Sequence, residues 1–376
     1  MAQTHEYPPV ESTTIAAQRN KLPAAATAPA ASPWQQALGP AALTQALQGQ
    51  RVLLVAPQFF GYEKDIRQEI ERQGAVVDWL PDRPFDTPAM TALTKLRPGW
   101  ILPAADRLYR RLLDGFGASR YDTILVLNGQ TLSPRLRSEL RTRFPTARMV
   151  LYMWDSQRNR PGMADDLQRF DAAFTFDADD ARRFGMRLRP LFFGPRFELP
   201  PSETFEHHLS FVGTAHTDRY AVVDHLRRSL PPGLRSFWYL YLQAPWVLQA
   251  YRLSKPAMRH ARRDEFHFTP MAKSRLGEVF AASRAILDIE HPKQRGLTMR
   301  TFETLGAHKK LVSTNAQVRD YDFYDPRNIC VIDRNAPRLP ADFLASPLVP
   351  WPPALYHRYS LRGWVQEVLG SAGARP

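Results

Sequence analysis

The chain has 376 residues, 44% of them hydrophobic and 23% charged, so it can form two globular domains with proper cores. A formal net charge of +13 and a pI of about 10.0 predict an anionic partner, such as nucleic acid, an anionic membrane surface, a nucleotide-sugar or a polyanionic acceptor. The basic residues are scattered over both halves of the chain, which argues against a dedicated nucleic-acid-binding arm.

The cysteine content and the hydropathy of the sequence exclude several further classes of protein. Cys330 is the single cysteine, which excludes a disulfide framework and a cysteine-rich zinc site. It lies in the predicted core strand Asn328–Asp333, so a structural thiol is expected rather than a nucleophile. No stretch approaches 18 consecutive apolar residues, and no apolar segment follows a basic start. We therefore predict a cytoplasmic protein, free or peripheral at the inner membrane face.

The chain is expected to open with a tail that does not belong to either core. Residues 1–33 are rich in Ala, Pro, Thr and Gln and have few large apolar side chains, so burial cannot offset the entropy of ordering them. Trp34–Gln48 reads as a short helix beside the first domain. Residues 1–48 are thus predicted to be a disordered tail followed by a short helix.

A first α/β domain is predicted over residues 49–196. Its first strand is Arg51–Pro57, and a helix from Glu63 to Gln73 follows. Further strands are expected at Ala75–Leu80, Thr123–Leu127, Met149–Met153, Ala172–Phe176 and Leu188–Leu191, and further helices at Arg107–Leu113, Pro134–Arg143 and Met163–Arg169. Strands that alternate with helices of this length predict a parallel, doubly wound sheet.

Ligands of such sheets bind at the carboxyl ends of the strands. In this domain those ends carry Gln58–Tyr62, Asn128–Gln130, Trp154–Ser156 and Asp177, which predicts a polar and partly aromatic crevice.

A second α/β domain is predicted over residues 197–350, after the proline-marked connection Phe192–Arg196. Its strands are expected at His208–Thr214, Ser236–Leu242, Ala285–Ile289, Leu311–Thr314 and Asn328–Asp333, and its helices from Tyr220, over Pro245–Arg263 and over Ala272–Ala282. The dinucleotide-binding pattern G-x-G-x-x-G is missing. Residues 351–376 are expected to form one or two helices. The predicted fold is thus two Rossmann-like, doubly wound parallel-sheet domains facing across a cleft.

The stretch from Ala285 to Asn315 reads as strand, loop, helix and strand. Thr298 is a plausible N-cap, and Gly306 is expected to end the helix in the left-handed conformation. A helix N-terminus beside a glycine and a threonine hydroxyl favours an anion such as a sugar-nucleotide diphosphate, and Glu303 could reach a ribose or sugar hydroxyl. An ordinary crossover unit is an equally good interpretation of this geometry.

Residues of this stretch carry a resemblance. Leu297–Gly306 followed by Lys309–Asn315 is similar to the sugar-donor motif of B-type-fold (GT-B) glycosyltransferases, and looks closest to the spore-maturation-protein-B-like and capsule or lipopolysaccharide branch. Phe211–Thr214 followed by Asp218 and Arg219 resembles the opening of that family's donor domain, and Asp177 resembles a feature near the end of its first domain. The likeness covers roughly residues 50–370.

The resemblance implies transfer of a sugar from a nucleotide-sugar that the C-terminal domain holds. It also implies no metal cofactor, since enzymes of this fold commonly place helix dipoles and basic side chains on the diphosphate. No metal-binding DxD motif follows a strand, and the pairs Asp165-Asp166 and Asp179-Asp180 lie in helical stretches as expected caps.

Many members of the wider superfamily that retain the configuration of the transferred sugar carry two glutamates eight positions apart. Glu303 matches the second, but the first falls on Arg295, which leaves inversion and retention both open.

Roles for the sugar-donor site follow from the resemblance. Gly296, Leu297 and Thr298 would face the phosphates with backbone N–H groups and a hydroxyl. Lys293 and Arg300 would neutralise the leaving diphosphate, although a surface position for Arg300 is as good an interpretation.

On the remaining sides of the site, Glu303 would bind ribose or sugar hydroxyls, with a capping or ion-pair role as its alternative. Gly213 and Thr214 would line the other side of the phosphates, with His216 and Arg219 nearby. His216 is more simply a loop histidine.

The acceptor's hydroxyl needs a general base, expected from the first domain across the cleft. Asp155, Glu63 and Asp65 are the candidates, and the sequence does not choose between them. In the second domain Asp288 and His291 lie at the mouth of a strand. His291 would contact the sugar or stabilise a turn.

One aromatic and basic stretch of the second domain suggests a further partner. Trp238–Trp246, with Arg252, Lys255, Arg259, Arg262 and Arg263, could rest on an anionic membrane surface, although a core-packed helix with a solvated basic face is the simpler interpretation.

Three functions are compared with these features. The first is a metal-independent glycosyltransferase of cell-surface polysaccharide or glycoconjugate assembly, with a glycan, lipid-linked or protein acceptor. The second is a non-catalytic sugar-nucleotide or polyanion-binding protein of the same fold. The third, a nucleic-acid-binding protein, is not expected because no recognition motif accompanies the charge.

Overall fold

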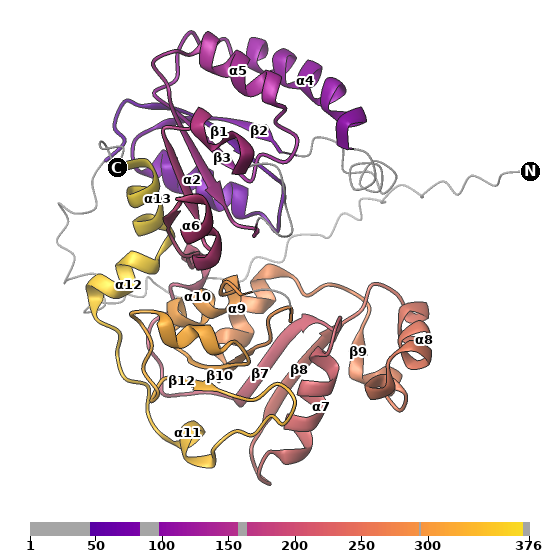
Figure 1. The fold of residues 1–376 in the computed structure, drawn as a ribbon. Helices are drawn as coiled ribbons and strands as arrows, with labels where there is room; N and C mark the ends of the chain where they lie inside the picture. Colours follow the sequence, from indigo (N-terminus) through magenta and orange to yellow (C-terminus); the bar gives the residue numbers. More distant parts are fainter. Residues whose placement is uncertain (1–45, 83–97, 157–163, 293–294, 371–376) are drawn as a thin grey trace, which may run out of the picture.

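The structure is a computed structural model that describes residues 46–82, 98–156, 164–292 and 295–370. Two six-stranded parallel sheets, each with its own helices, make up the molecule (Figure 1). The predicted fold class of two doubly wound α/β domains is confirmed. The predicted tail and nearly all of the predicted helix Trp34–Gln48 lie outside the described residues.

The first domain is built on the strand order β2-β1-β3-β4-β5-β6. Its strands are β1 (Arg51–Ala56), β2 (Val76–Pro81), β3 (Thr123–Leu127), β4 (Arg148–Met153), β5 (Ala172–Thr175) and β6 (Arg187–Leu188). Its helices are α2 (Tyr62–Arg72), α4 (Pro98–Gly115), α5 (Pro134–Arg143), η2 (Ala164–Arg169) and α6 (Ala178–Phe184). The central strand β3 is buried at every position, because helices cover both faces of a parallel sheet.

The second domain has the strand order β12-β11-β10-β7-β8-β9. Its strands are β7 (His207–Thr214), β8 (Ser236–Tyr241), β9 (Phe266–His267), β10 (Ser283–Asp288), β11 (Lys310–Ser313) and β12 (Ile329–Val331). Its helices are α7 (Arg219–Ser229), α8 (Pro245–Ser254), η4 (Pro256–Met258), η5 (Arg263–Glu265), α9 (Lys273–Ala281), α10 (Met299–Gly306), η6 (Ala316–Asp320) and α11 (Ala341–Ala345). Figure 1 shows α9 and α10 between the two sheets.

The chain crosses between the domains twice. The first crossing contains η3 (Pro195–Phe197), and the second leads into α12 (Pro353–Tyr359) and α13 (Leu361–Gly370). Phe193, in the first crossing, donates its N–H to Tyr359 O at 2.9 Å and accepts from Leu361 N at 2.9 Å, so backbone hydrogen bonds join the two crossings. The last helix therefore returns to the first domain, where it packs on α2 and β4.

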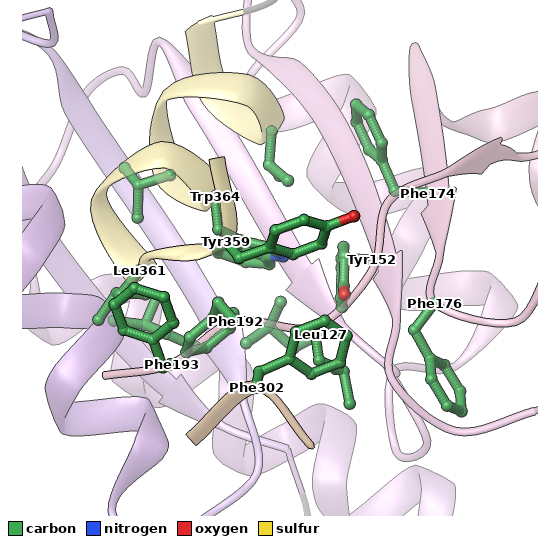
Figure 2. Packing of buried hydrophobic residues seen from close by; sticks show 14 of the residues in the cluster. Leu127, Tyr152, Phe174, Phe176, Phe192, Phe193, Phe302, Tyr359, Leu361 and Trp364 are labelled. Atoms are coloured by element: carbon green, nitrogen blue, oxygen red, sulfur yellow. The ribbon is translucent and has the colours of Figure 1, made fainter. Parts of the chain in front are cut away.

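The returning helix is anchored by one large aromatic side chain. Trp364 is fully buried, with its ring centroid 4.7 Å from that of Tyr152 and 5.0 Å from that of Phe192. Figure 2 shows these rings in one apolar cluster that also contains Phe302 of α10. A continuous core thus joins the two domains at the crossings.

Two local predictions were wrong. The predicted helix Pro245–Arg263 ends at Ser254, because Pro256 lacks a backbone N–H and disfavours helical geometry at the residue before it. Gly306 is not the left-handed residue after α10; it lies inside the helix, and His308, at φ 51°, takes that conformation. A Cβ at Gly306 would overlap the Phe193 ring, which explains the glycine by close packing.

Candidate functional site

Asp288 organises the predicted sugar-donor unit. It ends β10 and is buried, and one of its carboxylate oxygens accepts hydrogen bonds from the hydroxyls of Thr298 and Thr301, each at 2.7 Å. Thr298 is the N-cap of α10, as predicted, and its hydroxyl accepts from Arg300 N at 3.1 Å. The positive end of the α10 dipole is thereby fixed beside the carboxyl end of β10.

The loop between β10 and α10, residues 289–298, is held against the first domain. Gly296 lies so close to Phe176, after β5, that a Cβ would overlap the ring. Leu297 is buried, and Asn315 Nδ2 donates to Arg295 O at 3.0 Å. Lys293 lies outside the described residues.

Arg219 links the carboxyl ends of β7 and β10 through hydrogen bonds to backbone carbonyls. Its Nε donates to Ile289 O at 2.8 Å, and its Nη1 donates to Thr214 O at 3.4 Å. Gly213 lies one residue earlier in β7, with Arg219 Nη1 3.5 Å from the position that a Cβ would take. Gly213, Thr214 and Arg219 therefore meet the loop at the edge where β7 and β10 end. Ligands bind at such an edge in doubly wound folds.

Glu303 points toward the first domain. Its carboxylate is buried and accepts a hydrogen bond of 2.6 Å from the hydroxyl of Tyr62, at the start of α2. Arg300 Nη1 lies 3.1 Å from the other carboxylate oxygen, and Arg300 Nη2 donates to Val212 O at 3.2 Å. Burial, together with the Glu303 carboxylate, raises the pKa of Tyr62 well above its ordinary value, so Tyr62 keeps its proton. Lys273 Nζ lies 4.9 Å from the centre of the Tyr62 ring.

Two histidines flank the loop in the second domain. The ring centroids of His216 and His291 are 6.0 Å apart. Burial, with the positive charge of Arg219, lowers the pKa of His216 to about 4, so this ring is neutral at pH 7. Lys255 Nζ donates to Thr217 O at 3.1 Å and keeps a further positive charge beside it.

A charged cluster centred on Arg334 was not predicted from the sequence. Arg334, which follows β12, pairs with both carboxylate oxygens of Asp218, at 2.9 and 2.8 Å, and with Glu290, whose carboxylate also accepts from Thr314. These residues follow four different strands and meet at one edge of the sheet. A signal existed, because Glu290 and Arg334 each come directly after a predicted strand, where site residues are expected.

The predicted bases lie in different surroundings. Glu63 is buried and accepts from Phe59 N at 3.2 Å, so it stabilises its own loop. Asp155 is partly exposed after β4, with one carboxylate oxygen 3.5 Å from Asn128 Nδ2. Asp65 lies near Lys273, where it opposes the lowering of the lysine's pKa by burial. Which of them acts as the base stays a prediction.

A cavity of about 450 Å³ lies between the domains, beside Gly296, α6, η6 and α12. Most of its charged side chains form ion pairs with one another. Asp179 pairs with Arg182 and, across the domains, with Arg295 at 2.8 Å. Asp322 accepts from Arg358 at 2.8 Å and from Tyr359 at 2.5 Å. Arg295 therefore forms an ion pair between the two domains.

The described residues contain no group of three or more His, Cys, Asp or Glu side chains arranged to hold a metal ion. None of the described helices is long and apolar enough to span a membrane. Cys330 lies half-buried in β12, where burial raises the pKa of its thiol.

Comparison with known proteins supports the fold. No family model and no curated protein matches the sequence. Among solved structures, Anabaena Alr3699/HepE in complex with UDP and glucose is similar at 12% identity, with a TM-score of 0.53 over 86% of this chain and 100% of that chain. The lipopolysaccharide outer core galactosyltransferase WaaB matches at 10% identity and a TM-score of 0.47, over 85% and 99% of the two chains. The chain has the two-domain α/β fold known as GT-B.

Proposed function

We propose that the protein transfers a sugar from a nucleotide-sugar to an acceptor. The observation that carries this proposal is the N-terminus of α10, fixed by Asp288 beside the end of β7 and the guanidinium of Arg219. A helix N-terminus with a fixed cation beside it stabilises the negative charge that grows on a leaving diphosphate. HepE, which shares the fold, was crystallised with UDP and glucose, so uridine nucleotides are the first to test.

The acceptor is proposed to be a glycan, a lipid-linked sugar or a protein in cell-surface polysaccharide or glycoconjugate assembly. The likeness of residues 297–315 to the spore-maturation-protein-B-like and capsule or lipopolysaccharide branch supports this choice. Reaction without a metal ion is part of the proposal, because the α10 dipole, Arg219 and Arg300 supply positive charge at the proposed phosphate position.

The proposal assigns Glu303 to the hydroxyls of the nucleotide-sugar. In the structure the Tyr62 hydroxyl donates a hydrogen bond to that carboxylate, so a bound ribose or sugar hydroxyl would take the place of the Tyr62 hydroxyl. Binding of the nucleotide would then break the hydrogen bond between Glu303 and the first domain.

A thermal-stability panel of UDP-, GDP-, ADP- and CMP-sugars tests the site. One diphosphate nucleotide is expected to raise the melting temperature, as ligand linkage requires, and Glu303→Ala is expected to abolish the shift. Tyr62→Phe should keep the shift, because it removes the competing hydroxyl and leaves the carboxylate. Glu71→Ala, at an exposed glutamate of α2 paired with Arg67, is the matched control and should respond as the natural protein does.

A second measurement separates transfer from binding alone. Release of nucleotide diphosphate, followed with and without EDTA in the presence of candidate acceptors, is expected in both conditions. A thermal shift without any release would instead assign the chain to non-catalytic sugar-nucleotide binding. No response to any nucleotide would contradict the proposal.

A further inference from the structure

Helix α8 exposes two large apolar side chains on one face. Trp246 is 71% exposed and Leu253 is 90% exposed. They are seven residues apart, which places them two turns apart on the same side of a helix. Val247 and Leu248, on the opposite side, are buried in the core of the second domain. One face of α8 thus packs on the core of the second domain, and the other face exposes a tryptophan and a leucine to solvent.

The segment around α8 is strongly positive. Five lysines and arginines lie between Pro245 and Arg263, and no acidic residue lies among them; the cations are Arg252, Lys255, Arg259, Arg262 and Arg263. Arg259, Arg262 and Arg263 are exposed. Only Arg262 pairs with a carboxylate in the described residues, at 3.1 Å from Asp264, and both partners are 70% exposed. Asp264 offsets one of these charges, so the other four cations carry the positive field of the segment.

This segment is held in place beside the helix. Arg252 donates from Nε and Nη2 to Ala261 O, at 2.9 and 2.5 Å, which ties the end of the basic segment to α8. Met258 and Ala261 are buried in the core of the second domain. Figure 1 shows α8 at the periphery of that domain, beside β9. The exposed apolar side chains and the cations are therefore carried by adjacent segments that are fixed to the same domain.

We propose that this surface, α8 together with residues 255–263, docks on an anionic lipid bilayer. Trp246 and Leu253 would enter the region between headgroups and acyl chains, where the amphipathic indole ring is favoured, and the arginines would contact lipid phosphates. The proposal does not depend on the sugar-transfer activity, because Trp246, Leu253 and the three exposed arginines lie outside the sugar-donor site proposed above.

A bilayer fits this surface better than a protein or a nucleic acid. A stable protein interface covers about 800 Å² per partner around an apolar centre. Here only two large apolar side chains project from the helix, and an excess of positive charge borders them. A nucleic acid would need the cations but would leave the exposed Trp246 and Leu253 without a role. The combination of both features matches the interface of a bilayer.

Vesicle co-sedimentation of the full chain tests the proposal. Binding is expected to vesicles of phosphatidylcholine with phosphatidylglycerol, to be weak on phosphatidylcholine alone, and to fall with added salt. The variant Arg259→Gln/Arg262→Gln/Arg263→Gln should lower the partition constant about fivefold per arginine, which corresponds to about 1 kcal/mol each. The variant Trp246→Ser/Leu253→Ser should lower it at least about tenfold.

Matched substitutions elsewhere keep the test specific. Val76→Ser/Leu188→Ser removes two other exposed apolar side chains, and Arg120→Gln removes a cation that is 73% exposed. Both should bind as the natural protein does. Quenching of tryptophan fluorescence by brominated lipid should occur in the natural protein and be largely lost in Trp246→Phe.

The proposal is overturned by any of three results. These are binding that is indifferent to anionic lipid, equal losses in the α8 variants and the controls, and binding that needs the arginines but not Trp246 and Leu253. The last result would show that the surface attracts polyanions in general and has no specific affinity for a bilayer.

Discussion

At the scale of single residues, Asp288 is the side chain on which the proposed sugar-donor site depends. One buried carboxylate oxygen accepts both threonine hydroxyls that begin α10. Asp288→Ala should therefore lower the free energy of unfolding by about 2–4 kcal/mol, since two hydroxyls lose their acceptor inside the protein. Urea unfolding measures the loss.

Asp288→Asn serves as the conservative comparison. Its amide oxygen can accept the same two hydrogen bonds, so the loss should be less than half that of Asp288→Ala. Asp264→Ala, at an exposed aspartate, should change the unfolding free energy by about 0.5 kcal/mol or less. Equal losses in all three variants would show that the hydroxyls do not depend on Asp288.

The consecutive lysines Lys309 and Lys310, in the motif that resembles a sugar-donor motif, show how burial and hydrogen-bond partners decide the role of a residue. Lys309 and Lys310 are both buried, and burial lowers the pKa of each to about 8. Lys309 Nζ donates to Ala281 O at 3.0 Å and Lys310 Nζ donates to Phe343 O at 2.7 Å. They tie β11 and the turn before it to α9 and α11, so the described contacts give both lysines a structural role.

At the scale of elements, α12 holds the end of α10. Tyr356 donates its hydroxyl to Gly306 O at 2.8 Å, and its ring stacks on His308 with centroids 4.7 Å apart. Burial, with the nearby Lys309, lowers the pKa of His308 to about 4. The neutral imidazole is therefore part of the contact between the α10–β11 turn and α12.

This contact predicts a loss of stability in mild acid. The unfolded chain binds a proton on His308 near pH 6.5, whereas the folded chain binds it only near pH 4, so the unfolding free energy should fall as pH drops from about 6.5 to 4. Each pH unit in that window costs at most about 1.4 kcal/mol for this group. Urea unfolding at a series of pH values measures the slope.

His308→Gln is the control for this slope, because glutamine does not titrate. Its slope between pH 6.5 and 4 should be shallower than that of the natural protein, with the remaining part coming from other groups such as His216. An unchanged slope would contradict the assignment to His308.

At the scale of the whole molecule, α13 couples the two domains. Trp364 is fully buried against Tyr152 and Phe192. Trp364→Ala should lower the unfolding free energy of the first domain by about 3–5 kcal/mol, because it removes a large side chain from a filled core. Limited proteolysis under native conditions should then cut the first domain faster.

The same chain supplies a control for a large-to-small change at tryptophan. Trp246→Ala truncates a ring that is 71% exposed and should change the unfolding free energy by about 0.5 kcal/mol or less. Similar losses for Trp246→Ala and Trp364→Ala would contradict the anchoring role of Trp364.

The sequence by itself determined the two parallel sheets and the start of α10. Apolar runs bounded by Gly, Pro and polar residues mark strands through local patterning, and Thr298 caps its helix through a bond two residues along the chain. Tertiary structure alone decided the partners of Glu303 and Gly296, which are Tyr62 and Phe176 in the other domain. Tyr62 and Glu303 are 241 positions apart. No local periodicity encodes such a pair, because packing between the domains brings it together.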